Sequence, residues 1–480
     1  MYLGIDLGTS GVKAAVIGDA GVIVAQASAP LAVSRPRPSW SEQAPEDWWR
    51  ATCTAILALP AEVRAAVRGV GLAGQMHGAC LLGADDRPLR PAILWNDGRS
   101  FAECAEIEAV EPCSCAITGN LAMPGFTAPK LAWVRHHEPE LMAALRTVLL
   151  PKDYLRLRLT GDKASDLSDS AGTLWLDVGA RDWSDAMLAA THLTRAQMPR
   201  LFEGTQVTGT LRAELAREWG MNPVPVVAGG GDNAAGAAGV GVVGDGDALL
   251  SLGTSGVIFV ATAQFRPNPE RAVHAFCHCV PGMWHQMSVH LSAAACLDWA
   301  AGALGLGDAA GVVAAAERAG IGQSDELFLP YLSGERTPHN DPHVRGAFLR
   351  ADNDTDAARL AAAVLEGVAF AHADGLASLR EAGTVVDELA VIGGGGRSRH
   401  WGRILASVLD ARLLYLDGGE VGPALGAAKL AQVAVTGASP GEVCTRPAVR
   451  DAVEPEPELA RRLAPKLEKF RRAYAAIRDI

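Results

Sequence analysis

A single acidic residue, Asp232, follows three consecutive glycines in the stretch PVVAGGGDNAAGAAG at residues 225–239. Glycine has no Cβ atom, so a ligand could approach the backbone closely at this point. A carboxylate that follows a strand, in a loop facing a cleft, can accept a proton from a hydroxyl group. The stretch therefore predicts a site at which Asp232 acts as a general base.

A second candidate for chemistry is a six-residue sequence that occurs twice. LGTSGV stands at residues 7–12 and again, letter for letter, at residues 252–257, an offset of 252 − 7 = 245 residues. Each copy lies between apolar runs, which predicts a strand-turn-strand hairpin. The N–H and hydroxyl groups of such a turn can bind an anion. Either turn alone could be an ordinary surface turn, but two hairpins facing each other could hold one polyphosphate.

The elements that position these residues follow from the repeat and the length. A chain of 480 residues with a repeated hairpin near its start and its middle predicts two related domains of similar size. Apolar spacing predicts helices from about 45 to 59 and from 356 to 383. A strand is expected to end at Gln75-Met76-His77-Gly78, a plausible substrate edge, and ELAVIGGGGRSRHW (388–401) predicts a strand, an open glycine turn and a helix start.

Composition excludes several classes of function. The net charge of −11 disfavours a nucleic-acid partner, which needs an extended basic surface. No apolar run approaches the ~18 residues that span a bilayer, so no membrane association is expected. The nine cysteines lack CxxC spacing and form no predicted disulfide framework, and the start of the chain has no signal-like segment. We therefore expect a soluble, cytoplasmic protein with reduced cysteines.

Other motifs carry less weight. GxGxxG occurs at 69–74 and 239–244, but the first match lies within an expected strand and the second closes an expected helix, so neither predicts a dinucleotide site. No GxxxxGK[ST] sequence is present. Four histidines gather in one segment without acids or thiols at ligand spacing, which favours packing over zinc: 274, 278, 285 and 290.

The full series of motifs resembles the FGGY carbohydrate kinases, within the actin, hexokinase and heat-shock-chaperone superfamily. The resemblance runs essentially end to end and rests on the ordered series MYLGIDLGTSGVK, WSEQ, GQMHG, ILWNDGR, GNLAMPGFTAPKL, LLPKDYLRLRLTG, SDLSDSAGT, AGGGDNAAGA, LSLGTSGV, PYLSGERTPHN, IGGGGRS and GPALGAA. One departure is His136, where a longer polar residue is expected outside the site. The resemblance implies an α/β fold of two ribonuclease-H-like domains, at residues 1–243 (sugar binding, catalytic base) and 244–480 (ATP binding), with an active-site cleft between them.

The resemblance also implies roles for individual residues. The expected activity is ATP-dependent phosphorylation of D-xylulose to D-xylulose 5-phosphate in D-xylose catabolism, with ATP and Mg²⁺ as cofactors. Asp232 would be the general base, and Asp6, through water, and Asp232 would hold Mg²⁺. The resemblance assigns the remaining site residues to the ketose (Met76, His77, Asp232, Asn233 and Trp95) and to ATP (Thr9, Lys13, Gly253, Thr254, Gly394 and Gly395). It leaves a homodimer open.

Each role has an ordinary structural alternative. Asp6 could cap its hairpin, His77 could be a satisfied core histidine, and Trp95 could merely pack. A sister kinase acting on ribulose, gluconate or glycerol would share the fold and the phosphate motifs. The chain could also be a chaperone, a filament former or a sugar-sensing repressor on the same fold. A chaperone would need an appended peptide-binding domain and a repressor a helix-turn-helix arm, and neither is expected in a chain whose first strand starts at residue 2.

Overall fold

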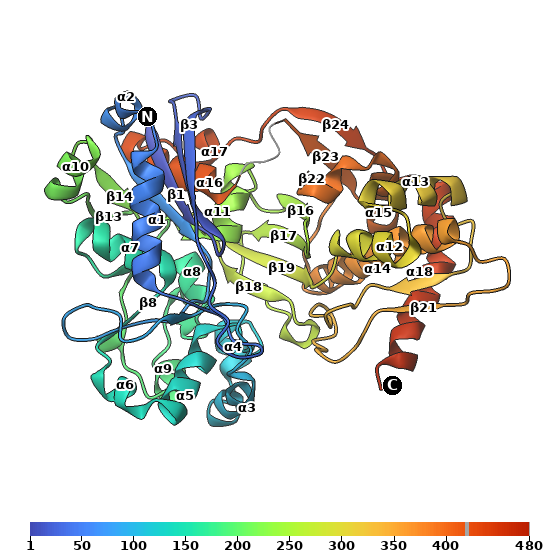
Figure 1. Cartoon of the computed structure of the whole chain (residues 1–480), viewed down its shortest axis with the longest axis horizontal. Helices are drawn as coiled ribbons and strands as arrows, with labels where there is room; N and C mark the ends of the chain where they lie inside the picture. The colour runs from blue at the N-terminus through green and yellow to red at the C-terminus, as the bar shows by residue number, and fades with distance from the viewer. Residues whose placement is uncertain (418–421, 480) are drawn as a thin grey trace.

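The computed structural model describes residues 1–417 and 422–479 and consists of two lobes, each built on a seven-stranded mixed sheet (Figure 1). In spatial order, the first sheet contains β13 (Val207–Thr210), β14 (Pro225–Val227), β5 (Val70–Gly74), β1 (Tyr2–Leu7), β2 (Gly11–Ile17) and β3 (Ile23–Pro30), with β15 (Gly230–Gly231) also paired to β5. The second sheet contains β18 (His274–Cys277), β19 (Trp284–His290), β17 (Gly256–Thr262), β16 (Ala248–Leu252), β22 (Glu388–Ile392), β23 (Arg412–Leu416) and β24 (Val449–Val453).

Six strands of each sheet share one pattern of parallel and antiparallel pairing, as expected for two related halves; the second sheet adds β18 beyond β19. In each, the hairpin that carries LGTSGV is antiparallel and is extended by a further antiparallel strand on one side. On the other side, the first strand of each hairpin pairs in parallel with a later strand, β5 with β1 and β22 with β16. The next strand outward is again parallel, and an antiparallel strand ends each of these sides. Two related α/β halves follow from this pairing.

The two identical hairpin sequences close in registers that differ by one residue. In the first, Leu7 lies opposite Val12, whereas in the second Leu252 lies opposite Gly256 rather than Val257. The surroundings differ accordingly. The carbonyl of Ser10 accepts the N–H of Leu31, while the carbonyls of Gly253 and Thr254 accept N–H groups of residues 293–295, which lead into the helix that begins at Ala295. Tertiary contacts therefore decide the register that the local sequence leaves open.

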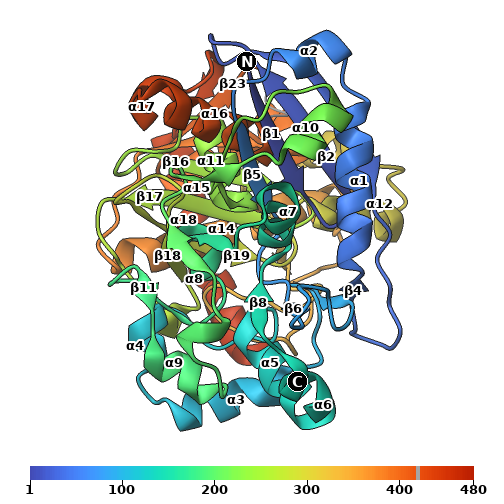
Figure 2. The ribbon, with the colours of Figure 1, turned by 90° about the vertical axis from the view of Figure 1, so that its left-hand side faces the viewer.

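Helices cover the first sheet and form a subdomain beneath it (Figures 1 and 2). The helices of the first half are α1 (Pro45–Leu57), α2 (Ala61–Ala65), α3 (Phe101–Val110), α4 (Ser114–Thr118), α5 (Thr127–His137), α6 (Pro139–Ala144), α7 (Pro151–Thr160), α8 (Leu167–Ala171), α9 (Asp185–Ala190), α10 (Ala213–Trp219) and α11 (Asp232–Gly239). Short strand pairs connect them: β4 (Glu42–Gln43) with β7 (Ala92–Ile93), β6 (Cys80–Leu82) with β8 (Thr147–Leu149), β9 (Ala164–Asp166) with β12 (Arg200–Phe202), and β10 (Leu176–Asp177) with β11 (Asp182–Trp183). The predicted helix at 45–59 is confirmed as α1.

The second half adds α12 (Ala295–Leu304), α13 (Ala309–Ala319), α14 (Ala357–Glu381), α15 (Arg399–Leu409), α16 (Pro423–Thr436), α17 (Pro440–Val443), α18 (Pro457–Ile477) and the strand pair β20 (Leu327–Leu329) with β21 (Ala347–Leu349). The predicted helix at 356–383 is confirmed as α14, whose N-terminus is capped by the Asp356 side chain. Among the described residues, α14 alone is long and apolar enough to cross a membrane as a single helix, but 89% of its apolar window is buried, as in the core helix of a soluble protein.

Helix α16 comes from the second half of the chain but packs against β1, β5 and α11 of the first lobe (Figure 2). Glycines allow this close contact. A Cβ atom on Gly4 would lie 1.8 Å from the carbonyl oxygen of Ala424, one on Gly71 1.9 Å from that of Ala427, and one on Gly426 1.7 Å from that of Ala235. The small-residue motif GPALGAA is therefore a packing motif, and the first lobe is completed by a helix that lies far away in the sequence.

This packing predicts that alanine in place of glycine lowers stability at the α11–α16 contact but not at a helix position that faces open space. Gly426→Ala should lower the free energy of unfolding by about 1–3 kcal/mol or more, since the added methyl overlaps backbone of α11. Gly302→Ala is the matched control, because Gly302 also lies within a helix but faces open space, so alanine should be neutral or stabilising by up to about 1 kcal/mol. Thermal and urea unfolding of both variants measures the difference; equal midpoints would contradict the packing role.

Candidate active site

Asp232 is the first residue of α11, so the predicted loop before the helix is wrong: the helix begins at the acid itself. The three preceding glycines also serve a different purpose from the one predicted. Gly229 has a φ of 78°, and its Cβ would lie 1.8 Å from the carbonyl oxygen of Leu72. A Cβ on Gly230 would meet Cys279, and one on Gly231 would meet Met76. The glycines let the chain approach its own neighbours rather than a ligand.

Asp6 and Asp232 form a pair of interacting carboxylates. Asp6 lies at the end of β1, opposite Lys13 in β2. Burial, and next the charge of Asp232, raise the pKa of Asp6 to about 7 against the opposing effect of Lys13. Burial raises the pKa of Asp232 to about 6, although its Oδ1 accepts hydrogen bonds from the backbone N–H (2.7 Å) and side-chain amide (2.9 Å) of Asn233. A buried acid whose pKa is raised further by a second, neighbouring carboxylate is typical of a functional site.

His77 is held in a strained backbone conformation beside the Asp232 segment. Its φ is 69°, and its carbonyl oxygen accepts hydrogen bonds from Lys130 Nζ (2.8 Å) and Thr127 Oγ1 (3.1 Å). The ring Nδ1 lies 2.6 Å from the carbonyl oxygen of Gly172, so Nδ1 carries the proton and Nε2 is an acceptor. Burial, followed by the charge of Lys130, lowers the pKa of His77 to about 3, which keeps the ring neutral. Met76, buried next to it, contacts Gly231.

The first LGTSGV turn is fixed by a hydrogen-bond network of side chains, of which sequence reasoning did not single out Gln43. Thr9 Oγ1 donates to Gln75 Oε1 (2.9 Å) and accepts from the Trp95 indole N–H (2.9 Å). Gln43, from the WSEQ motif, donates to the carbonyl of Thr9 at 2.7 Å and accepts from Gln75 and Trp48. Trp95 remains 46% exposed, so it borders the turn without being enclosed. No local sequence signal marks Gln43 as part of this network, because only the fold brings it to the turn.

A separate cavity of about 660 Å³ lies in the second lobe. Gly253, Thr254, Gly394 and Gly395 line it, together with residues of α12, α13 and the start of α15. A Cβ on Gly394 would meet no atom within 4 Å, whereas one on Gly395 would touch Leu252 and Trp401. Gly394 therefore offers open backbone to a ligand, and Gly395 is required by internal packing.

The structure thus gathers the predicted site residues into two groups. The first lobe brings together Asp6, Lys13, Asp232 and Asn233, with Met76 and His77 next to them and with Thr9 and Trp95 at the hairpin turn. The second lobe brings Gly253, Thr254, Gly394 and Gly395 to one cavity. Two acids that line the same cavity were missed by sequence reasoning, Asp298 in α12 and Glu317 in α13.

The remaining motifs have structural roles. Within residues 1–417 and 422–479, no group of three or more histidine, cysteine or acidic side chains is arranged to hold a metal ion. His274 stacks on Phe276 and His285 on Phe259, while His278 meets Phe259 edge-on, as expected for packing. All nine cysteines are free. The first GxGxxG match lies mostly within β5 and the second follows α11, so neither opens a helix.

The comparison with protein-family models gives two matches. The N-terminal domain of the FGGY family of carbohydrate kinases matches residues 1–239, and the C-terminal domain matches residues 248–435. Together they cover most of the chain in the expected order. The chain belongs to the FGGY family of carbohydrate kinases.

Particular relatives are similar over the whole chain. A protein from Escherichia coli (strain K12) named xylulose kinase is 54% identical over 99% of this chain and 98% of its own. A xylulose kinase from Klebsiella pneumoniae is 53% identical over 100% of both chains. A solved structure described as a xyloylose kinase from Brucella ovis has a TM-score of 0.96 and 50% identity, covering 99% of both chains.

The buried histidines predict a pH-dependent stability. Burial, and next the neighbouring His290, lower the pKa of His372 to about 3, so the unfolded chain binds more protons than the folded chain below pH 6.5. The stability that neutral His372 contributes is therefore complete above pH 6.5 and is lost as the pH falls. Between pH 6.5 and 5 the loss should be about 2 kcal/mol. His372→Gln cannot titrate, so its stability deficit relative to the parent should shrink by that amount. A deficit that stays constant with pH would contradict the assignment.

Proposed function

We propose that this kinase transfers the γ-phosphate of ATP to the terminal hydroxyl of D-xylulose, giving D-xylulose 5-phosphate and ADP in D-xylose catabolism. The names of the relatives that are 53–54% identical over the full chain support this substrate. The observation in the structure that carries the proposal is the Asp6–Asp232 pair, at the end of β1 and the start of α11, next to the first glycine-rich turn. Phosphoryl transfer needs such alignment and charge more than it needs covalent chemistry.

In the proposed reaction Asp232 accepts the proton of the sugar hydroxyl. The hydroxyl oxygen forms a bond to the γ-phosphorus, the bond between the γ-phosphorus and the β–γ bridging oxygen breaks, and ADP leaves with that electron pair. A pKa of about 6 suits Asp232 to this step, because the group is mostly ionised at neutral pH yet more basic than an exposed carboxylate. The contacts from Asn233 orient its Oδ1.

The acids also fit a divalent cation. Asp6 Oδ1 is buried without a hydrogen-bond partner, and two neighbouring carboxylates together with phosphate oxygens form the ligand set that Mg²⁺ prefers. Asp6, through water, and Asp232 would hold Mg²⁺, which when bound would offset the negative charge of the phosphates. Thr9 and Lys13 on the first hairpin would contact those phosphates.

The two groups of residues divide the substrates between them. Neutral His77 provides an acceptor at Nε2, Asn233 adds amide donors, and Met76 offers an apolar surface to the carbon chain. Trp95 would border the sugar site. The cavity in the second lobe would hold the nucleotide, with Gly253 and Thr254 at the phosphates and Gly394 and Gly395 at the adenosine; its volume of about 660 Å³ suits a ligand of that size.

The proposal also covers the cellular location of the enzyme, its partners and the division of the chain into two functional parts. The expected cellular location is the cytoplasm, the expected partner is a small-molecule ketose, and a division of the chain after residue 243 separates sugar-binding from ATP-binding parts. A homodimer stays open, and independence from nucleic acid and membranes remains a prediction from the net charge of −11 and the absence of a long apolar run.

Replacing the base should separate catalysis from nucleotide binding. We expect Asp232→Asn to lower kcat by about 10²–10⁴-fold while ATP affinity and the thermal midpoint stay near those of the parent. Asp354→Asn, on an exposed loop, is the matched control and should leave kcat unchanged. Steady-state kinetics and nucleotide titration measure both. Near-normal turnover in Asp232→Asn would remove this residue from the mechanism.

The identity of the sugar substrate can be tested with a set of candidate substrates. ADP release at fixed MgATP, measured with D-xylulose, D-ribulose, L-ribulose, gluconate and glycerol, should give the highest kcat/KM for D-xylulose. A higher value for gluconate or glycerol would assign the chain to a sister activity on the same fold.

A further inference from the structure

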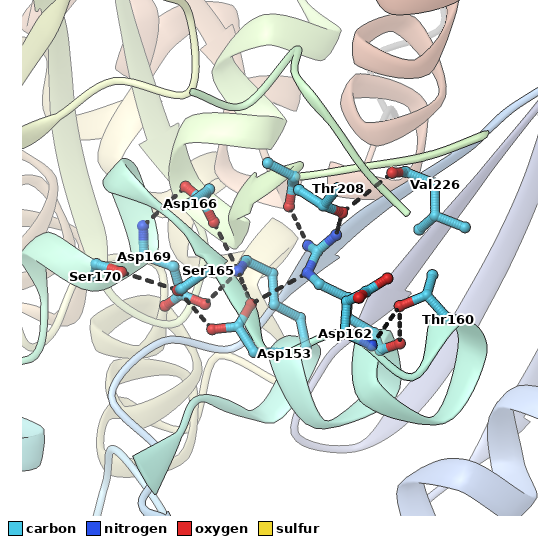
Figure 3. Close-up of polar contacts among 12 residues, drawn as sticks. Asp153, Thr160, Asp162, Ser165, Asp166, Asp169, Ser170, Thr208 and Val226 are labelled. Carbon is cyan, nitrogen blue, oxygen red and sulfur yellow. Dashed lines mark hydrogen bonds and ion pairs between the residues drawn. The ribbon is translucent and has the colours of Figure 1, made fainter. Parts of the chain in front are cut away.

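A cluster of charged side chains is buried next to the chain segment that leads to Asp232, and Figure 3 shows its members Asp153, Asp166 and Asp169. Lys152 Nζ lies 2.6 Å from Asp153 Oδ1, 2.6 Å from Asp166 Oδ1 and 3.3 Å from Asp169 Oδ2. Arg156, one turn along α7, lies 3.9 Å from Asp153. All five side chains are fully buried. The proposed chemistry uses none of them.

The charges of the cluster balance when Asp169 is protonated. Burial, against the opposing charge of Lys152, raises the pKa of Asp169 well above its usual range. Burial lowers the pKa of Lys152, but the three acids outweigh this effect and raise it overall. Two cations then face two carboxylates. Buried ion pairs of this kind rarely add net stability compared with apolar packing, which leaves a role in fixing one geometry.

The cluster contacts the backbone on both sides of the glycine segment. Arg156 donates to the carbonyl oxygens of Val227 (2.8 Å) and Ala228, the two residues before Gly229. The N–H of Gly231 donates to Ser168 Oγ at 3.1 Å, and Ser168 Oγ in turn donates to Asp166 Oδ2. Chains of hydrogen bonds that end on an ion pair polarise one another and are stronger than isolated ones.

These contacts act on a backbone that has no side chains of its own to hold it. Gly229, Gly230 and Gly231 have the greatest conformational freedom of any residue type, so their geometry must come from outside the segment. Ser168 binds the peptide that immediately precedes the first turn of α11. The orientation of Asp232 therefore depends on that hydrogen bond as well as on the pairing of β15 with β5.

We propose that Ser168, anchored through Asp166 to Lys152 and assisted by Arg156, is a positioning residue that fixes the Gly229–Gly231 backbone and so aims the Asp232 carboxylate at the reacting hydroxyl. The proposal deepens the proposed function and rests on Asp232 as the base. It assigns no substrate contact to the cluster. A displacement of about 1 Å in a catalytic group can cost about 10²-fold in rate, so loss of one hydroxyl is expected to be visible in kcat.

Two serines of α8 provide a matched pair for the test. Ser168→Ala removes the link to Gly231, whereas Ser170→Ala removes an equally buried hydroxyl that donates to Ser165 Oγ at 2.9 Å. Both should lower the thermal midpoint by a few degrees, with the larger fall in Ser168→Ala, because Ser168 Oγ makes two buried hydrogen bonds and Ser170 Oγ makes one. Ser168→Ala should lower kcat about 10- to 100-fold with KM for ATP and sugar within about threefold, and Ser170→Ala should keep kcat within about threefold. Equal kcat values in the two variants would overturn the proposal.

A double-mutant cycle identifies the residue through which Ser168 acts. In the Asp232→Asn background, Ser168→Ala should change the residual kcat by less than about twofold, because there is no base left to position. The same factor in both backgrounds would show that Ser168 acts elsewhere and would overturn the inference. If Asp232→Asn alone retains turnover, the proposed function fails at its base. If Asp232→Asn is impaired and Ser168→Ala is not, the positioning role alone fails.

Discussion

The site depends on one constraint: the chain before Asp232 must pass through a space too narrow for any side chain. Gly229 lies directly against the backbone of β5, and Gly230 and Gly231 face Cys279 and Met76. Larger residues would push the strand away and move the acid. The Gly229–Gly231 segment has no side chains that restrict its backbone. Three neighbouring elements therefore fix its conformation: β5 by pairing, α7 through Arg156, and α8 through Ser168.

Close packing at glycines and other small residues also determines the structure of the rest of the first lobe. Glycines in β1 and β5 let α16 lie on the backbone of the sheet, and small residues in α11 and α16 let these helices approach closely. The helix that starts with the base is therefore packed against a helix from the far end of the chain.

Much of this arrangement could be predicted from the sequence. The features that could not be predicted all have the same cause. The fold class and family could be predicted from the repeated LGTSGV hairpins, the helices α1 and α14, and the ordered series of motifs. Apolar spacing and glycines at turns are local features that can be read directly from the sequence. The one-residue difference in hairpin register, the role of the three glycines and the start of α11 at Asp232 depend on neighbours distant in sequence. Roles for Gln43 and Lys130 were missed for the same reason: each acts on a backbone carbonyl that only the fold brings near.

The central claim is that the Asp232 carboxylate is held where a sugar hydroxyl meets the end of a triphosphate. The most direct measurement is a crystal structure of the enzyme with D-xylulose and a nonhydrolysable ATP analogue. The account predicts an Asp232 oxygen within hydrogen-bond distance of the terminal hydroxyl, about 2.6–3.2 Å, with the γ-phosphate in line beyond it. A sugar bound with its terminal hydroxyl away from Asp232, or a triphosphate outside the reach of the first hairpin, would contradict it.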